Sequence, residues 1–371
     1  MHGQWNGYYQ GTNTGSISVN IDEMLSTYKG VAYINEQNPA LPRTAATFET
    51  PTKANKQTFV AHIEPVNPQT GMADNWERIK PLYADGVVIP KTANVEIRHT
   101  KNFLYLKWVT DIGTKGKCKL PKSHASKPSN VLANQMSWRD FKNAIEKLDG
   151  GRSLIFRGQS DKWRLRTSFH RRGRADLFRF IREDIPTLHK HLSLRTTHLF
   201  DLTVPDQNGA FFNLVQHHGY PTPLLDWTYS PYVAAFFAFN DVDKKQAKVA
   251  KESDCVRIYV FNQKLWCSTF QQHIQLLTST SHFSIAEFLS TNNERMIPQQ
   301  AISSVTNVDD IESHILSHQQ HGPTFLTAID IPKSERAKAM LELQYMGITA
   351  ASLFPGLDGT CAELRERNFR G

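Results

Sequence analysis

Two short motifs place polar side chains directly after apolar segments, a position from which side chains often reach a ligand. The first motif is Arg157-Gly158-Gln159, which follows the apolar segment 153–156. A guanidinium presents a planar set of donors that suits phosphate or carboxylate, and Gly158 lacks a side chain that would hinder the approach of a ligand. The motif therefore predicts an anion-binding site at the end of a strand. An arginine that only caps carbonyl groups or pairs with an internal acid is the structural alternative.

The second motif ends just before a predicted helix. Asp226 and Thr228 precede Ser230, a good N-cap residue, which is followed by a proline suited to the first helical turn. The free N–H groups and the dipole of a helix start favour anions. We predict that Arg157, Gln159, Asp226 and Thr228 line one concave site, where Arg157 donates to phosphate oxygens and Asp226 accepts from hydroxyl groups. In the alternative interpretation, Asp226 only stabilises the turn.

A basic segment, residues 162–195, holds most of the positive charge of the chain. It contains ten basic and three acidic residues, so its net charge of +7 nearly equals the +8 of the whole chain. Aromatic residues lie between these cations, a combination typical of surfaces that bind a nucleic-acid backbone. Arg171, Arg172 and Arg174 are the predicted nucleic-acid contacts. The alternative is the solvated face of an amphipathic helix, because apolar residues between 177 and 188 have helical spacing.

Taken together, the motifs resemble the FRG domain, a family named for a Phe-Arg-Gly tripeptide. The resemblance spans roughly residues 138–360 and is most specific in its long central motif. The similar segments are 156–158, 216–231 and 353–359, with Asn293, Arg295 and Gln299 matching a shorter Asn-x-Arg motif that has a downstream Gln.

The order of the motifs is also similar, more remotely, to that of ADP-ribosyltransferases. In that family an early strand supplies an arginine that grips NAD, a later strand precedes a helix rich in Ala and Phe, and a third strand supplies a Glu or Gln. The resemblance implies NAD as cofactor, catalytic roles for Arg157, Thr228 and Gln299, and cofactor contacts from Arg157, Gln159, Asp226 and Thr228. The resemblance to the FRG domain also implies an effector in a toxin or anti-phage setting. A nucleic-acid-binding or processing module and a non-catalytic interaction protein remain as alternatives.

The N-terminal region, residues 1–112, predicts an all-β domain. Residues 16–21 alternate polar and apolar side chains, and residues 95–109 contain two such runs joined by a short polar turn. Further strands are predicted at 30–35, 57–63 and 86–89. We expect an antiparallel barrel or sandwich from these patterns. The stretch 113–130 is rich in Lys and has no acidic residue, which predicts a solvated linker.

Residues 131–371 predict a mixed domain in which no regular β-α-β repeat is visible, so the expected fold class is α+β. Ser137 can cap its first helix, and Gly150 can end that helix. Helices are predicted at 137–150, 174–192, 208–218, 231–239 and 333–346, and strands at 153–156, 256–262, 323–331 and 348–354.

Composition limits the remaining choices. No apolar run approaches the ~20 residues that span a bilayer, and the first residues lack the pattern of a secretory signal, so we expect a cytoplasmic protein without a membrane segment. The four cysteines include no CxxC pair, and we predict neither a metal site nor a disulfide. The excess of basic over acidic residues favours acidic partners: a nucleotide or another small-molecule ligand, or nucleic acid.

Overall fold

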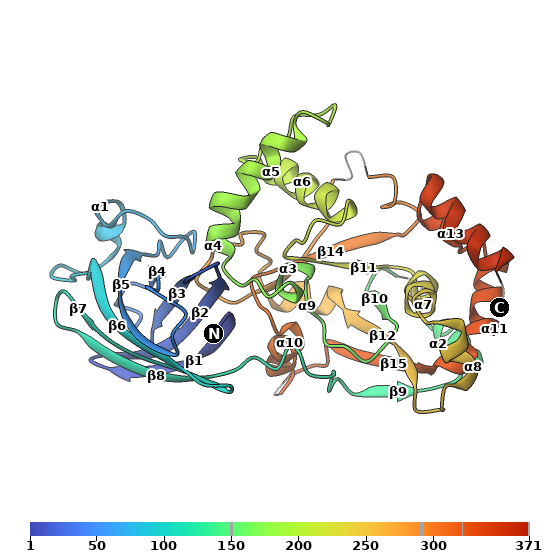
Figure 1. The fold of residues 1–371 in the computed structure, drawn as a ribbon, viewed down its shortest axis with the longest axis horizontal. Coiled ribbons are helices and arrows are strands. Elements are labelled where there is room, and N and C mark those ends of the chain that lie inside the picture. The colour runs from blue at the N-terminus through green and yellow to red at the C-terminus, as the bar shows by residue number, and fades with distance from the viewer. Residues whose placement is uncertain (149–150, 290–292, 321, 370–371) are drawn as a thin grey trace.

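The computed structural model describes residues 1–148, 151–289, 293–320 and 322–369. A β-barrel forms the N-terminal end of the molecule, and a helix-covered sheet forms the C-terminal part (Figure 1). Within these described ranges, no helix has the length and apolar character needed to cross a lipid bilayer.

Eight antiparallel strands form the barrel. Each strand pairs with the next one in the sequence, and β8 closes the barrel against β1. Side chains alternate between the two faces of each strand, so Ile17, Val19 and Ile21 of β2 point inward and are almost fully buried. The all-β prediction for the N-terminal region is confirmed, and the architecture is a barrel. The strands are β1 (Gly3–Gly11), β2 (Thr14–Glu23), β3 (Tyr28–Glu36), β4 (Thr44–Glu49), β5 (Lys56–Pro65), β6 (Thr92–His99), β7 (Phe103–Thr110) and β8 (Lys115–Pro121).

Two details of the N-terminal region differ from the sequence expectation. Residues 86–89, predicted as a strand, lie in the irregular connection between β5 and β6. The stretch 113–130, predicted as a linker, contains β8, whose lysines face solvent while Cys118 and Leu120 face the barrel interior. The prediction gave weight to the Lys content, whereas the alternation of charged with small or apolar residues decided the structure.

The C-terminal part contains a sheet with the strand order β13-β14-β11-β10-β12-β15-β9. All neighbouring pairs are antiparallel except β15 and β9, which are parallel. Strands β10 and β11 carry the two motifs predicted to bind a ligand, and the sheet places them side by side near its middle. The strands are β9 (Ala133–Gln135), β10 (Leu154–Gln159), β11 (Leu224–Thr228), β12 (Cys255–Asn262), β13 (Phe283–Ala286), β14 (Ala301–Thr306) and β15 (Leu326–Pro332).

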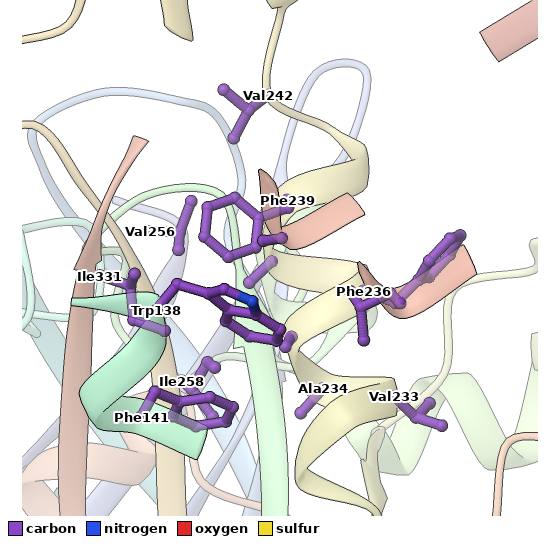
Figure 2. Packing of buried hydrophobic residues seen from close by; sticks show 14 of the residues in the cluster. Trp138, Phe141, Val233, Ala234, Phe236, Phe239, Val242, Val256, Ile258 and Ile331 are labelled. Carbon is purple, nitrogen blue, oxygen red and sulfur yellow. The ribbon is translucent and has the colours of Figure 1, made fainter. Parts of the chain in front are cut away.

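Helices cover both faces of this sheet. On one face α2, α7 and α11 pack against β10, β12 and β15, and Figure 2 shows the ring of Trp138 from α2 close to Phe239 of α7 and Val256 of β12, with the ring of Phe141 stacked beside Trp138. On the other face, α9 and α10 enclose a second apolar cluster around Trp266. The helices are α1 (Trp76–Ile79), η1 (Lys80–Leu82), α2 (Trp138–Ile145), α3 (Ser168–Arg171), α4 (Leu177–Arg179), η2 (Phe180–Asp184), α5 (Ile185–Leu192), α6 (Pro205–His217), α7 (Pro231–Asn240), α8 (Lys244–Val249), α9 (Gln263–Thr269), α10 (Ile311–Gln319), η3 (Lys333–Glu335), α11 (Arg336–Tyr345), α12 (Ala350–Leu353) and α13 (Leu357–Asn368).

The observed fold class is α+β, as expected, and most of the predicted helices are present. The helices predicted at 174–192, 208–218, 231–239 and 333–346 correspond to α4-η2-α5, α6, α7 and η3-α11. The strand predicted at 348–354 is wrong, because Thr349 starts the short helix α12 with a capping box that involves Ser352. The first predicted helix, α2, ends at Ile145, and Gly150 lies outside the described residues.

Buried polar contacts join the barrel to the C-terminal part. Asp22 of β2 is fully buried and forms ion pairs with Arg174 and, at 3.3 Å, with Arg179. Gln4 of β1 donates a hydrogen bond of 2.8 Å to the carbonyl oxygen of Asn307. The barrel therefore supplies a carboxylate that compensates part of the basic segment 162–195.

Candidate functional site

The candidate site forms where β10 and β11 separate. These two strands share a single register pair, Phe156 with Thr228. Because the strands are antiparallel, the residues after Phe156 run beside the residues before Thr228, which brings Arg157 next to Asp226. Nη1 of Arg157 donates a hydrogen bond of 2.5 Å to the carbonyl oxygen of Asp226. Strand pairing thus joins two motifs that lie far apart in the sequence.

A cavity of about 390 Å³ opens at this separation. It gathers the four residues that the sequence analysis placed in one concave site, which are Arg157, Gln159, Asp226 and Thr228. Gln299, from the segment before β14, lies in the same lining. The geometric part of the prediction is therefore met, while the roles of these residues in binding or catalysis stay predictions.

Three arginines line the cavity, and within the described part of the chain none of them forms an ion pair with a carboxylate. They are Arg157, Arg171 and Arg295. The Nε atoms of Arg157 and Arg295 are buried and lack a hydrogen-bond partner among the described residues. A buried donor without an acceptor costs roughly 1–3 kcal/mol, and more when it is charged. An anionic ligand in the cavity would offset the charge of these arginines.

Burial has a direct effect on the Arg157 guanidinium. It lowers the pKa of Arg157 to about 10, and the Asp226 carboxylate opposes this change only in part. The side chain is therefore still charged at neutral pH, but the folded protein holds this charge at a cost in free energy. Nearby, the guanidinium of Arg295 lies over the ring of Phe354, 5.0 Å from its centroid.

The hydroxyl and amide groups of the lining hold the cavity wall together. The Thr228 hydroxyl donates to the carbonyl oxygen of Gln299 at 2.7 Å and accepts from the Ser230 N–H at 3.0 Å. The side-chain amide of Gln299 donates to the Leu353 carbonyl oxygen at 2.9 Å. In the same way, Gln159 donates to the backbone of a rim residue, Trp163, at 2.9 Å. These bonds fix the side chains in position and leave the amide oxygens of Gln159 and Gln299 as acceptors.

Asp226 is the exposed carboxylate beside the arginines. Its Oδ1 accepts a hydrogen bond from the side-chain amide of Gln216, and the amide oxygen of Gln216 in turn accepts from the Thr222 hydroxyl. This chain of bonds orients the carboxylate toward the cavity. One further carboxylate, Asp241, lies in the lining, so the three arginines outnumber the acids.

Gly158 has a different primary role from the predicted one. A Cβ atom at this position would lie 1.8 Å from the carbonyl oxygen of Ala234 in α7. The absence of a side chain is therefore required for the close packing of α7 on β10, and access for a ligand is at most a second consequence. The start of α7 agrees with the sequence prediction, since the Ser230 side chain accepts from the Val233 N–H and Pro231 occupies the first turn.

The basic segment 162–195 is largely compensated by acids. Arg164 pairs with Asp310 at 2.9 Å, and Arg166 pairs with Asp309. Arg174, one of the three predicted nucleic-acid contacts, is engaged with Asp22 and Asp184, and Arg179 pairs with Glu183. The other two predicted contacts, Arg171 and Arg172, are both exposed, and Arg171 also lines the cavity. Nucleic-acid binding by these residues stays a prediction.

In a comparison with known protein families, the family model of the FRG domain matches residues 152–247, so this part of the chain is similar to the FRG domain. No curated protein and no solved structure matched the chain. The matched range contains both motifs on β10 and β11, whereas Arg295, Gln299 and Phe354 of the cavity come from the sequence that follows it.

Sequence reasoning missed several residues of the cavity. Arg295 was noted only as part of the Asn-x-Arg motif, and Trp163 only as one of the aromatic residues within the basic segment. Phe354 was noted only as part of the similar segment 353–359, and Asn213 carried no signal beyond its place in a predicted helix. Arg171 was assigned to nucleic-acid binding because its neighbours in the sequence are basic. The signal that could have identified Arg295 is its position in the Asn-x-Arg motif. This motif shows no pattern of core residues, so a structural role does not explain it.

Proposed function

We propose that the cavity binds a phosphate-bearing nucleotide, that NAD is the substrate, and that the protein is an ADP-ribosyltransferase-like enzyme. The observation that supports this proposal is a set of three arginines around one cavity that form no ion pair with a carboxylate of the described residues; in two of them the buried Nε also has no partner among these residues. A diphosphate brings the negative charge and the acceptor oxygens that these groups lack. The volume of about 390 Å³ lies within the usual range for ligand pockets, ~300–1,000 Å³.

The other lining residues suit the remaining parts of a dinucleotide. Trp163 is 56% exposed, and its ring at the edge of the cavity is free to stack on a planar base. The oriented carboxylate of Asp226 is an acceptor for a ribose hydroxyl. Thr228 and Gln299 lie in the wall next to Asp226, and in the proposed complex they position the ribose that carries nicotinamide.

In the proposed reaction, the bond between the ribose C1 and the nicotinamide nitrogen breaks, and nicotinamide leaves with the bonding electron pair. The acceptor is water or a nucleophilic group of a target, which forms the new bond to C1 and gives up its proton. Arg157 holds the diphosphate during this step. Among the described lining residues the carboxylates are Asp226 and Asp241, with no glutamate, so Asp226 is assigned as the group that receives the proton.

Two adjacent arginines provide a matched test of the binding site. Arg171 lines the cavity, whereas Arg172 is exposed outside it, so R171Q should weaken the binding of ADP-ribose about tenfold or more and R172Q should leave it unchanged. Calorimetric titration with ADP-ribose, and with nicotinamide riboside as a ligand without phosphate, measures this difference. Equal binding by both variants, or equal affinity for the two ligands, would contradict a phosphate site in this cavity.

The release of nicotinamide from NAD tests the reaction separately from binding. We further propose an effector role in a toxin or anti-phage setting, in which this reaction consumes cellular NAD or modifies a target. Production of the protein in bacterial cells should then lower the NAD concentration or slow growth, and an R157M variant should not. Binding of ADP-ribose without any release of nicotinamide would limit the function to nucleotide binding.

A further inference from the structure

The interior of the barrel contains a second cavity, remote from the candidate site and independent of the proposed function. Its volume is about 140 Å³, and it opens to solvent at one end of the barrel. The mouth lies at the end of the barrel where β1–β2, β3–β4, β5–β6 and β7–β8 are connected. Residues 88–90 of the β5–β6 connection, part of which the sequence analysis took for a strand, belong to the lining at this end.

Small side chains on four consecutive strands create this space. Ala32 of β3 lies opposite Ala46 of β4, and Ala61 of β5 lies opposite Ala93 of β6, and all four residues are buried in the lining. Protein interiors are normally packed as densely as organic crystals, and an unfilled apolar cavity costs stability. Larger aliphatic residues at these positions would fill the barrel, so the alanines keep room for another molecule.

The walls that face this space are aromatic. Phe48 and Phe59 stack with their ring centroids 4.9 Å apart, and Tyr9 lies beside Trp108 with centroids 5.5 Å apart. All four rings line the cavity. Rings of this kind favour a flat apolar ligand, and their faces attract a cation. By size, an apolar cavity of roughly 150 Å³ is known to accept benzene.

Two polar groups of the lining face each other inside the barrel. The Tyr9 hydroxyl, on a side chain that is 6% exposed, and Oε2 of Glu36, at the end of β3, are buried, and neither has a hydrogen bond of strict geometry among the described residues. Burial, together with a side-chain hydrogen bond to the Glu36 carboxylate, raises the pKa of Tyr9, so its hydroxyl stays protonated and donates to Glu36. The lining cation Lys115 is exposed at the mouth, where solvent and salt screen its charge.

We propose that the barrel is a binding site for a small aromatic molecule that carries one positively charged amine. The ring of this ligand fills the space between the alanines and the aromatic side chains. Its ammonium group donates to the Glu36 carboxylate, which also interacts with the Tyr9 hydroxyl in the same lining.

Three ligands with the same indole ring but different charge test the proposal by calorimetric titration of the full chain. Tryptamine carries an ammonium group, indole is neutral and indole-3-acetate is an anion. We expect tryptamine to bind about tenfold more tightly than indole, and indole-3-acetate to bind most weakly. An E36Q variant should reduce the preference for tryptamine over indole to about threefold or less. Preferential binding of indole-3-acetate would overturn the assigned role of Glu36.

Two neighbouring positions on β5 provide a matched pair of variants. Ala61 faces the cavity and is 2% exposed, whereas Val60 faces outward and is 49% exposed. An A61F variant should lose binding of tryptamine and indole by about tenfold or more, and V60F should retain it. If A61F fails to fold by circular dichroism, A46L fills the same cavity with a smaller side chain. No heat with any of the three ligands, or equal binding by A61F and V60F, would overturn the proposal.

Discussion

Replacement of Arg157 by Met should separate stability from ligand binding. Burial lowers the pKa of Arg157 from its ordinary value to about 10, which corresponds to roughly 3 kcal/mol of penalty on the charged side chain in the folded protein. This side chain is charged in the folded and in the unfolded chain at pH 7, so the folded state bears the whole penalty. Against this, R157M loses the hydrogen bond to the Asp226 carbonyl oxygen, which contributes about 1.5–3 kcal/mol for a charged donor.

The removed penalty and the lost hydrogen bond nearly cancel, and the sign of the net change in the free energy of unfolding shows which of them is larger. R157M should be as stable as the original protein or up to about 2 kcal/mol more stable, which corresponds to an increase in Tm of a few degrees. Its affinity for ADP-ribose should fall by about tenfold to a hundredfold, because it loses a charge-assisted hydrogen bond to phosphate. Thermal unfolding and calorimetric titration on the same samples measure both quantities.

A buried arginine that forms ion pairs with carboxylates provides the control. Arg164 is almost completely buried and pairs with Asp310 at 2.9 Å and with Glu312 at 3.7 Å. R164M should therefore lose about 3–5 kcal/mol of stability, because two buried carboxylates lose their partner, while the folded fraction still binds ADP-ribose. A strong loss of stability in R157M, or unchanged binding of ADP-ribose, would refute the functional reading of Arg157.

Three further predictions concern the fold around the site and the interface with the barrel. G158A should lose about 1–3 kcal/mol in urea unfolding, because the new Cβ would meet the Ala234 carbonyl oxygen at 1.8 Å. S230A should lose about 1 kcal/mol in the same assay, because the start of α7 loses its capping bond. Burial raises the pKa of Asp176 from 3.8 to about 7, so the folded state binds more protons than the unfolded state between these values and its stability falls as the pH rises. The free energy of unfolding should be roughly 2 kcal/mol lower at pH 8 than at pH 5, and D176N, which still accepts from the Arg179 N–H as a helix cap, should remove this difference. A D176N variant that keeps the pH dependence would assign it to another group.

The local sequence determined most of the secondary structure and both halves of the candidate site. Alternating side chains predicted the β-rich N-terminal region, and the pair formed by Ser230 and a following proline predicted the start of α7. These signals act over a few residues, because capping bonds and strand alternation depend on neighbours in the sequence. The predictions were wrong where two local signals competed. In β8 the alternation of side chains outweighed a lysine content that is typical of linkers. At 348–354 the capping box at Thr349 outweighed the apolar character that had predicted a strand.

Tertiary structure alone decided which charges are available to a ligand. In the sequence, Arg164, Arg171 and Arg174 belong to one basic segment, and nothing local distinguishes them. Folding places Arg174 against Asp22 of the barrel and Arg164 against Asp310, while Arg171 turns toward the cavity with Arg157. The physical reason is that an ion pair depends on distance in space, and its carboxylate here comes from a strand or helix more than a hundred residues away along the chain. The sequence could therefore supply the anion-binding side chains, but only the packing of the barrel and the sheet could leave some of them without a partner.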